Sequence, residues 1–282
     1  GITDLASPNL KWETTTGLNL GLDFTVLDQR FWGSLEYYNN NTENLLYNVD
    51  IPGISRFETF PDNLGKIHNY GVEDTLSSVN IRQPSFQWRS SLVFSLNRNE
   101  LVTLLGIDSD GDGVEDDLIS EELFIGESLN SIYDYYTTGE LWQLDEYFAD
   151  EIPPTADLGS YKILDNDENG VINPEDRKIL GTSDPLFRIA LDNRFRYKNW
   201  ELSFFINSIL GNDKYYLGQD DMMSFNVLNG HMWDNRIFPA NYRDLWTTEN
   251  PDARYQRQGV RLSSGLLARR YRPRSFARLQ DL

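Results

Sequence analysis

The sequence predicts an all-β protein, specifically an antiparallel transmembrane β-barrel segment with long extracellular loops. Two observations carry this prediction: apolar residues recur at every second position, and tight turns alternate with long polar connections. Each alternating run holds about 10–13 residues, which is enough to cross the hydrocarbon core of a bilayer when the strand is tilted. A β-sandwich would be built from strands of about 5–6 residues and shorter loops.

The first alternating run covers residues 18–26 and leads through a tight turn into a second run that starts at Phe31. Similar runs start at Phe86, Phe187 and Trp200. Successive residues of a strand point to opposite faces, so each run has an apolar face and a polar face. We expect these apolar side chains to face lipid: Leu18, Leu20, Leu22, Phe24, Leu92 and Phe94. We expect these polar side chains to face the barrel lumen: Asn19, Asp23, Arg89 and Ser91.

The connections between the runs differ sharply in length. Tight turns are predicted at residues 28–29, 83–84 and 198–199. The connections between them are long and polar, and they cover residues 42–66, 98–184 and 209–273. In an antiparallel meander this alternation places every short turn at one rim and every long connection at the other. Outer-membrane barrels have this arrangement, with periplasmic turns and extracellular loops.

Composition excludes several classes of protein. The chain has 282 residues, no cysteine, and 44 acidic against 25 basic side chains, which gives a net charge of −19. An acidic balance argues against nucleic acid as a partner, because a phosphate backbone needs a basic surface. With 39% hydrophobic and 13% aromatic residues, the chain is too apolar for a disordered acidic protein. The absence of cysteine excludes disulfides, zinc–thiolate sites and cysteine nucleophiles.

We predict no catalytic residue. The two histidines, His68 and His231, are far apart in the sequence and belong to no recognisable motif. Paired carboxylates such as Asp116 and Asp117 lack the scaffold of a glycosidase.

An acidic loop at residues 165–176 has the ligand spacing of an EF-hand calcium loop. Gly170 stands at position 6, where the chain must turn sharply. The predicted Ca²⁺ ligands are the side chains of Asp165, Asp167, Asn169 and Asp176 and the carbonyl of Val171. Asp176 is one methylene shorter than the usual glutamate at position 12, which reduces its reach. The alternative is an acidic turn held by side-chain-to-backbone hydrogen bonds without a metal.

A second acidic loop begins at Asp108 and has the same spacing at its first nine positions. The predicted Ca²⁺ ligands are Asp108, Asp110, Asp112, Val114 and Asp116. Position 12 is Ile119, which cannot bind a metal, so Asp117, Glu121 or Glu122 would have to substitute. The alternative is a solvated acidic loop tip. In both loops calcium would have a structural role, stiffening one long connection.

The connection 209–273 is rich in aromatic residues and methionine, from Tyr215 to Trp246. Such side chains in a polar setting either contact a carbohydrate or partner protein, or pack on one another to stiffen the loop.

Several short stretches, taken together, resemble the C-terminal part of SusC-like TonB-dependent outer-membrane transporters of Bacteroidetes. They follow one another in the order found in that family, and the resemblance covers nearly the whole chain. The stretches are residues 7–15, 63–65 with 69–73, 94–102, 165–176 followed by Gly181, Asp184 and Pro185, 246–251 and 275–279.

The resemblance implies a segment of a 22-stranded barrel in the outer membrane of a Gram-negative cell, which imports oligosaccharides or peptides with energy supplied through TonB. It also implies a SusD-like lipoprotein that covers the barrel as a lid. We expect residues 1–282 to be the C-terminal portion of such a barrel, because a plug and a TonB box are missing and a strand begins at Ser275. The remainder of the same barrel, outer-membrane lipid and the TonB complex, reached through the missing N-terminal region, are then its further partners.

Two other readings remain open on the sequence. A soluble calcium-dependent, β-rich adhesion or carbohydrate-binding protein would account for the acidic loops. A surface glycan hydrolase module is the third. Dependence on detergent separates the barrel from the soluble alternatives.

Overall fold

The computed structural model describes residues 10–50, 59–211, 216–219, 244–257 and 271–281. The chain forms two compact units. The first consists of residues 1–131, 182–212 and 274–282, and the second of residues 132–181 and 213–273.

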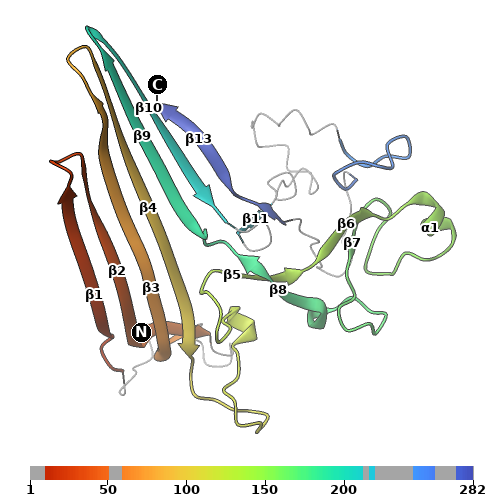
Figure 1. The fold of residues 1–282 in the computed structure, drawn as a ribbon. Helices are drawn as coiled ribbons and strands as arrows, with labels where there is room; N and C mark the ends of the chain where they lie inside the picture. The colour runs from red at the N-terminus through yellow and green to blue at the C-terminus, as the bar shows by residue number, and fades with distance from the viewer. Residues whose placement is uncertain (1–9, 51–58, 212–215, 220–243, 258–270, 282) are drawn as a thin grey trace, which may run out of the picture. The chain divides into compact units, whose positions relative to one another are not determined.

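The first unit is a seven-stranded antiparallel sheet in which neighbouring strands follow the order of the chain (Figure 1). Its strands are β1 (Thr14–Val26), β2 (Phe31–Asp50), β3 (Thr59–Arg82), β4 (Phe86–Thr103), β9 (Phe187–Tyr197), β10 (Trp200–Leu210) and β13 (Phe276–Asp281). The antiparallel all-β class is confirmed, as is the start of a last strand next to Ser275.

The three short turns lie at one end of this sheet, as the sequence predicts; in Figure 1 this is the upper end. Neighbouring turns are also bonded to one another. The Lys198 backbone N–H donates to the Ser85 carbonyl at 2.9 Å, and the Arg30 guanidinium donates to the Asn80 carbonyl at 2.9 Å. The connections that follow β2, β4 and β10 leave from the opposite end.

The strands run further than the sequence suggests. Residues 42–50 belong to β2 and residues 59–66 belong to β3. The bounds of the predicted loop 42–66 are therefore wrong, and only residues 51–58 lie outside these two strands. Likewise β4 continues to Thr103. The reason is that strand pairing persists beyond the apolar band: Thr42 is still paired with Ile67 across the β2–β3 ladder. Leu45, Leu46 and Tyr47 follow one another without alternation, and Leu45 and Tyr47 pack on a local core, so no period of two marks this part of the strand.

The two predicted faces of the sheet are confirmed by the register. Leu22 lies opposite Leu35, and Leu92 lies between Leu76 and Leu191. The apolar face stays open: Leu22 is 60% exposed. The opposite face is polar along its length, and its members include Asn19, Asp23, Ser91, Arg89, Asp192 and Arg194.

The polar ends of β2, β3 and β4 are closed by a small core. Ile67, Leu101, Leu104 and Leu123 are buried there, and the segment that follows β4 folds back onto them. Within this segment a 3₁₀ helix covers Ile119–Glu121. The acidic loop at Asp108 therefore projects from an ordered base.

The second unit contains three short two-stranded sheets. They pair β5 (Ser131–Tyr135) with β8 (Arg177–Thr182), β6 (Thr137–Leu141) with β7 (Tyr161–Ile163), and β11 (Leu217–Gln219) with β12 (Tyr271–Pro273). A one-turn helix, α1 (Leu144–Phe148), and a 3₁₀ helix (Pro174–Asp176) complete it. Its core is Leu141, Tyr161, Trp246 and Ala253. None of the helices in the described part of the chain is long and apolar enough to cross a bilayer.

Candidate substrate-binding wall and calcium loops

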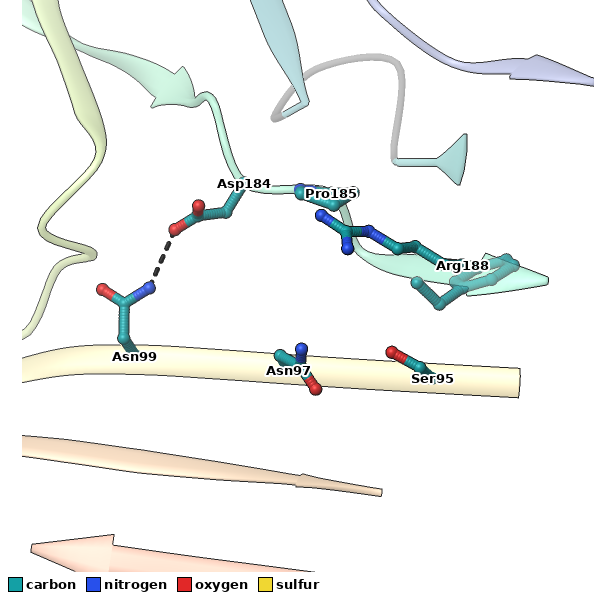
Figure 2. Close-up of a pocket in the computed structure, with 7 residues that line it drawn as sticks. Ser95, Asn97, Asn99, Asp184, Pro185 and Arg188 are labelled. Carbon is teal, nitrogen blue, oxygen red and sulfur yellow. Dashed lines mark hydrogen bonds between the residues drawn. The ribbon is translucent and has the colours of Figure 1, made fainter. Parts of the chain in front are cut away.

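A pocket opens on the polar face of the sheet, where β4 and β9 lie side by side (Figure 2). Alternation along β4 brings Ser95, Asn97 and Asn99 to this face, and Arg188 is the cross-strand partner of Ser95. The cavity has a volume of about 110 Å³. Its lining residues are Ser95, Asn97, Asn99, Asp184, Pro185, Phe187 and Arg188.

One side of the pocket is a tightly bonded carboxylate. Asp184 accepts hydrogen bonds from the Asn99 side-chain amide at 2.8 Å, the Ser128 hydroxyl at 2.6 Å and the Asn130 side-chain amide at 2.9 Å. The Asn99 carbonyl oxygen in turn accepts from the backbone N–H of Leu129 at 2.8 Å. Neutral donors therefore hold the Asp184 charge, and this side of the pocket is rigid.

Two further contacts fix the floor of the pocket. The Arg98 guanidinium donates to the Leu186 carbonyl at 2.8 Å, which holds the start of β9 against β4. The Tyr38 hydroxyl reaches across β3 and donates to the Asn97 side-chain oxygen at 2.9 Å. It passes directly over Gly71, where a Cβ atom would lie 2.5 Å from that hydroxyl. Glycine is therefore required at this point of the wall.

The pocket escaped the sequence reasoning, although five of its seven lining residues stand in stretches that carry the family resemblance. Ser95, Asn97 and Asn99 are visible as alternate polar residues of one strand. Nothing in the sequence, however, joins them to Asp184 and Arg188 some 90 residues later. The pairing of β4 with β9 makes that connection.

The Asp165 loop brings three of its predicted ligands together. One carboxylate oxygen from each of Asp165, Asp167 and Asp176 lies within 4.8 Å of the other two. Asp165 accepts a backbone hydrogen bond from Gly170 at 2.7 Å, and this bond lowers the pKa of the Asp165 carboxyl. Gly170 itself has φ +82°, as the sharp turn at position 6 requires.

The side chains of Asp176 and Asn169, two further predicted ligands, accept backbone hydrogen bonds within the loop. Asp176 is fully buried and accepts backbone hydrogen bonds from Asn166 at 2.7 Å and Asn173 at 2.8 Å. The Asn169 side-chain oxygen accepts from the backbone N–H of Val171 at 2.8 Å. Side-chain oxygens therefore hold the backbone of the loop at its beginning, middle and end. The carboxylates of Asp165, Asp167 and Asp176 converge within it. Hard oxygen ligands of this kind suit Ca²⁺.

The Asp108 loop also gathers three carboxylates, from Asp108, Asp110 and Asp116. Asp112 does not join them; its side chain accepts from the backbone N–H of Val114 at 2.7 Å. Hydrogen bonds from Ser109 lower the pKa of the Asp116 carboxyl.

Two of the residues proposed to replace Ile119 as a ligand are bonded elsewhere. Asp117 accepts from the backbone N–H of Ile125 at 2.7 Å, and Glu121 accepts from the Tyr47 hydroxyl at 2.9 Å. This loop is therefore the weaker of the two calcium candidates.

The aromatic connection is described only in part, since Met222, Phe225, His231 and most of its other candidates lie outside the described residues. Trp246 is 2% exposed, and its indole N–H donates to the Gln143 side chain at 3.0 Å. Tyr216 is 8% exposed. For these two residues the structure favours packing over surface recognition.

Comparison with known proteins decides the family. Residues 1–165 match the family described as TonB dependent receptor-like, beta-barrel, and the match covers more than half of the chain. The chain belongs to this family of TonB-dependent receptors. The predicted resemblance to SusC-like receptors and the barrel class are thereby confirmed.

Individual relatives agree. TonB-dependent receptor P26 of Formosa agariphila is 30% identical over 259 residues, which are 90% of this chain and 25% of that protein. TonB-dependent receptor SusC of Bacteroides thetaiotaomicron is 30% identical over 217 residues, or 74% of this chain and 20% of SusC. The structure titled "Structure of the RagAB peptide transporter" has a TM-score of 0.65 at 20% identity, and the likeness covers 99% of this chain and 29% of that one. The chain thus spans a quarter or less of the length of these curated relatives.

Proteins of this TonB-dependent receptor family reside in the outer membrane. In such barrels the apolar face meets lipid and the polar face lines the lumen, while short turns face the periplasm and long loops the outside. The Asp184–Arg188 pocket therefore lies on the lumen wall, close to the extracellular end of β9.

Sidedness can be tested with single cysteines, since this receptor segment contains none of its own. Ser109→Cys lies in the connection after β4, and Ser85→Cys lies in the turn between β3 and β4. On intact cells, a membrane-impermeant maleimide should label the first variant and not the second. After cell lysis both should react. Labelling of Ser85→Cys alone on intact cells would reverse the topology.

Proposed function

We propose that this chain forms part of the barrel wall of an outer-membrane importer, which takes up oligosaccharides or peptides in a TonB-dependent manner together with a SusD-like surface lipoprotein. The observation that carries the proposal is a membrane-spanning sheet of the TonB-dependent receptor family whose lumen face holds a preformed polar pocket. The relative named SusC and the solved RagAB peptide transporter support the class of activity. The chain acts by binding and passage and has no catalytic role.

The partner lipoprotein docks on the rim formed by the long connections, because that rim faces the outside. The remaining strands of the barrel pair with the free edges of β1 and β13, since unpaired strand edges are not tolerated in lipid. A complete barrel of 22 strands follows from the resemblance to SusC-like receptors, and seven of those strands lie in the sheet described above.

Calcium at the Asp165 loop is part of this proposal. The convergence of the Asp165, Asp167 and Asp176 carboxylates supports it, because a divalent cation turns their mutual repulsion into attraction. The ion would order residues 161–185 and take no part in transport chemistry. The Asp108 loop is proposed as a second, weaker calcium site.

The function is tested by uptake in the native host. Deletion of the complete gene should abolish growth on the imported nutrient, supplied as purified oligosaccharide or peptide pools, and a plasmid copy should restore it. Depletion of TonB should give the same loss. The parent protein should also need detergent to stay in solution. Undiminished uptake of every pool after deletion would refute the proposal.

A further inference from the structure

We propose that the pocket between β4 and β9 binds the anionic group of an acidic oligosaccharide, a carboxylate or a sulfate, with Arg188 as its main contact. This inference rests on the proposed import function and adds the class of substrate to it. Its central observation is an exposed guanidinium in the pocket, to which no residue that the structure describes supplies a counter-ion.

Arg188 forms no ion pair and no hydrogen bond with any residue that the structure describes. In Figure 2 its side chain extends from β9 back toward Pro185, along the wall of the pocket. Asp184 lines the same pocket, but no ion pair joins its carboxylate to Arg188; its oxygens accept three side-chain hydrogen bonds from neutral donors instead. A guanidinium presents a planar fork of donors that matches the oxygens of a carboxylate or sulfate.

Further donors surround the same space. The Asn97 side-chain oxygen is occupied by the Tyr38 hydroxyl, which leaves the amide N–H₂ of Asn97 for a ligand. The Ser95 hydroxyl lies directly across the ladder from Arg188. Donors on two strands thus converge beside the guanidinium, as recognition of an oxyanion requires.

The charge distribution of the lumen wall points the same way. The chain carries a net charge of −19, yet four arginines occur on the lumen faces of β4 and β9. Arg89 and Arg194 even lie directly opposite one another. Like charges in that position destabilise a sheet unless an opposite charge relieves them. Here Asp192 forms an ion pair with Arg194 at 3.2 Å, and Glu201 lies directly opposite Arg196. Arg188, by contrast, lies between Ser95 and Ile209, neither of which carries a charge. The four arginines are Arg89, Arg188, Arg194 and Arg196.

The carboxylate of Asp184 argues for a sugar rather than a peptide. Two ionised oxygens offer about four acceptor sites, and three are used by neighbouring side chains. The remaining site can accept a hydrogen bond from a hydroxyl group next to the anionic group. An acidic sugar carries both groups on one ring, whereas a peptide must supply the donor from a second group, its backbone or another side chain.

The test measures binding to the complete transporter, purified in detergent, by isothermal titration calorimetry. The probes are tetragalacturonate, a sulfated agaro-oligosaccharide, neutral maltotetraose and tetraglutamate. We expect the wild type to bind at least one of the two acidic sugars more tightly than maltotetraose. Comparing the affinity for tetragalacturonate with that for the sulfated oligosaccharide shows whether the preferred anionic group is a carboxylate or a sulfate. Arg188→Gln should weaken that binding by about 10- to 100-fold, the size of a lost charge-assisted hydrogen bond. Arg188→Lys should fall in between.

Arg82→Gln is the matched control. It removes the same charge from the short-turn end of the sheet, where Arg82 is paired with Gln87, and it should leave affinity unchanged. The proposal is overturned if Arg188→Gln binds acidic sugars as the wild type does, or if it loses acidic and neutral sugars equally. Preferential, Arg188-dependent binding of tetraglutamate would replace the sugar by an acidic peptide. If the transporter binds no acidic sugar but still takes up another nutrient, this inference is overturned and the proposed function stands. If it binds acidic sugars through Arg188 but shows no TonB-dependent uptake, the proposed function is overturned and the binding site stands.

Discussion

Leu92→Arg should destabilise the receptor by about 2–4 kcal/mol, the cost of a basic side chain on the lipid face of a barrel near the bilayer midplane. Leu92 lies in the middle of the apolar band, with Leu76 and Leu191 as its cross-strand partners. Both residues directly opposite it are leucines, so an arginine there meets no polar partner at its own position of the ladder. Its guanidinium must either lose hydration or extend toward a distant headgroup.

The next residue of the same strand provides the control. Val93 is also aliphatic and 45% exposed, but it points to the polar face, between Thr75 and Ala190. Val93→Arg should therefore cost little. Urea-induced unfolding of the complete receptor in lipid bilayers, followed by electrophoretic mobility, measures both variants. A similar loss for both, or a larger loss for Val93→Arg, would mean that the faces are assigned the wrong way round.

That contrast depends on information that the sequence already contains. Alternation of Leu18, Leu20 and Leu22 with polar residues determines which side chains share a face, because the period of a strand is two. The same alternation locates Leu92 and Ser91 on opposite faces, and no long-range contact is needed. For this reason the faces and the short turns were predictable.

Where alternation stops, prediction fails for a physical reason. Beyond the apolar band, Leu45 and Tyr47 of β2 pack on a local core instead of continuing the apolar face, so residues 42–50 and 59–66 show no period. The backbone ladder holds this part of β2 against β3. On its other side, a hydrogen bond of 2.9 Å between the hydroxyl groups of Thr15 and Thr42 joins β2 to β1. Such contacts join residues far apart in the sequence, and composition does not reveal them.

The candidate sites divide in the same way. The acidic loops are local, and the spacing of Asp165, Asp167 and Asp176 alone predicts that their carboxylates converge, as they do. The lumen pocket is not local. Asn97 and Arg188 become neighbours only because β4 pairs with β9, although residues 104–186 separate the two strands in the chain.

Asp176→Ala should unfold the Asp165 loop whether or not calcium is present. The Asp176 carboxylate is fully buried and accepts the backbone N–H groups of Asn166 and Asn173, which bond the first and last parts of the loop to one residue. Each donor left without a partner costs roughly 1–3 kcal/mol, so the local free energy of opening should fall by roughly 2–6 kcal/mol. Hydrogen exchange of peptides covering residues 161–185, measured by mass spectrometry on the complete receptor, should show this segment exchanging much faster, while the sheet stays protected.

Asp165→Ala combined with Asp167→Ala should behave differently, which separates the buried carboxylate from the proposed ion. Asp167 is exposed and Asp165 only partly buried, so without calcium their loss should be felt weakly. In the wild type, calcium at about 100 times its dissociation constant would add about 2.7 kcal/mol of protection, and the double variant should lose that increment. Glu168→Ala with Glu175→Ala removes two charges from the same loop outside the ligand positions, and calcium should still protect it. If millimolar calcium fails to slow exchange in the wild type, the loop is an acidic turn that Asp176 alone holds together.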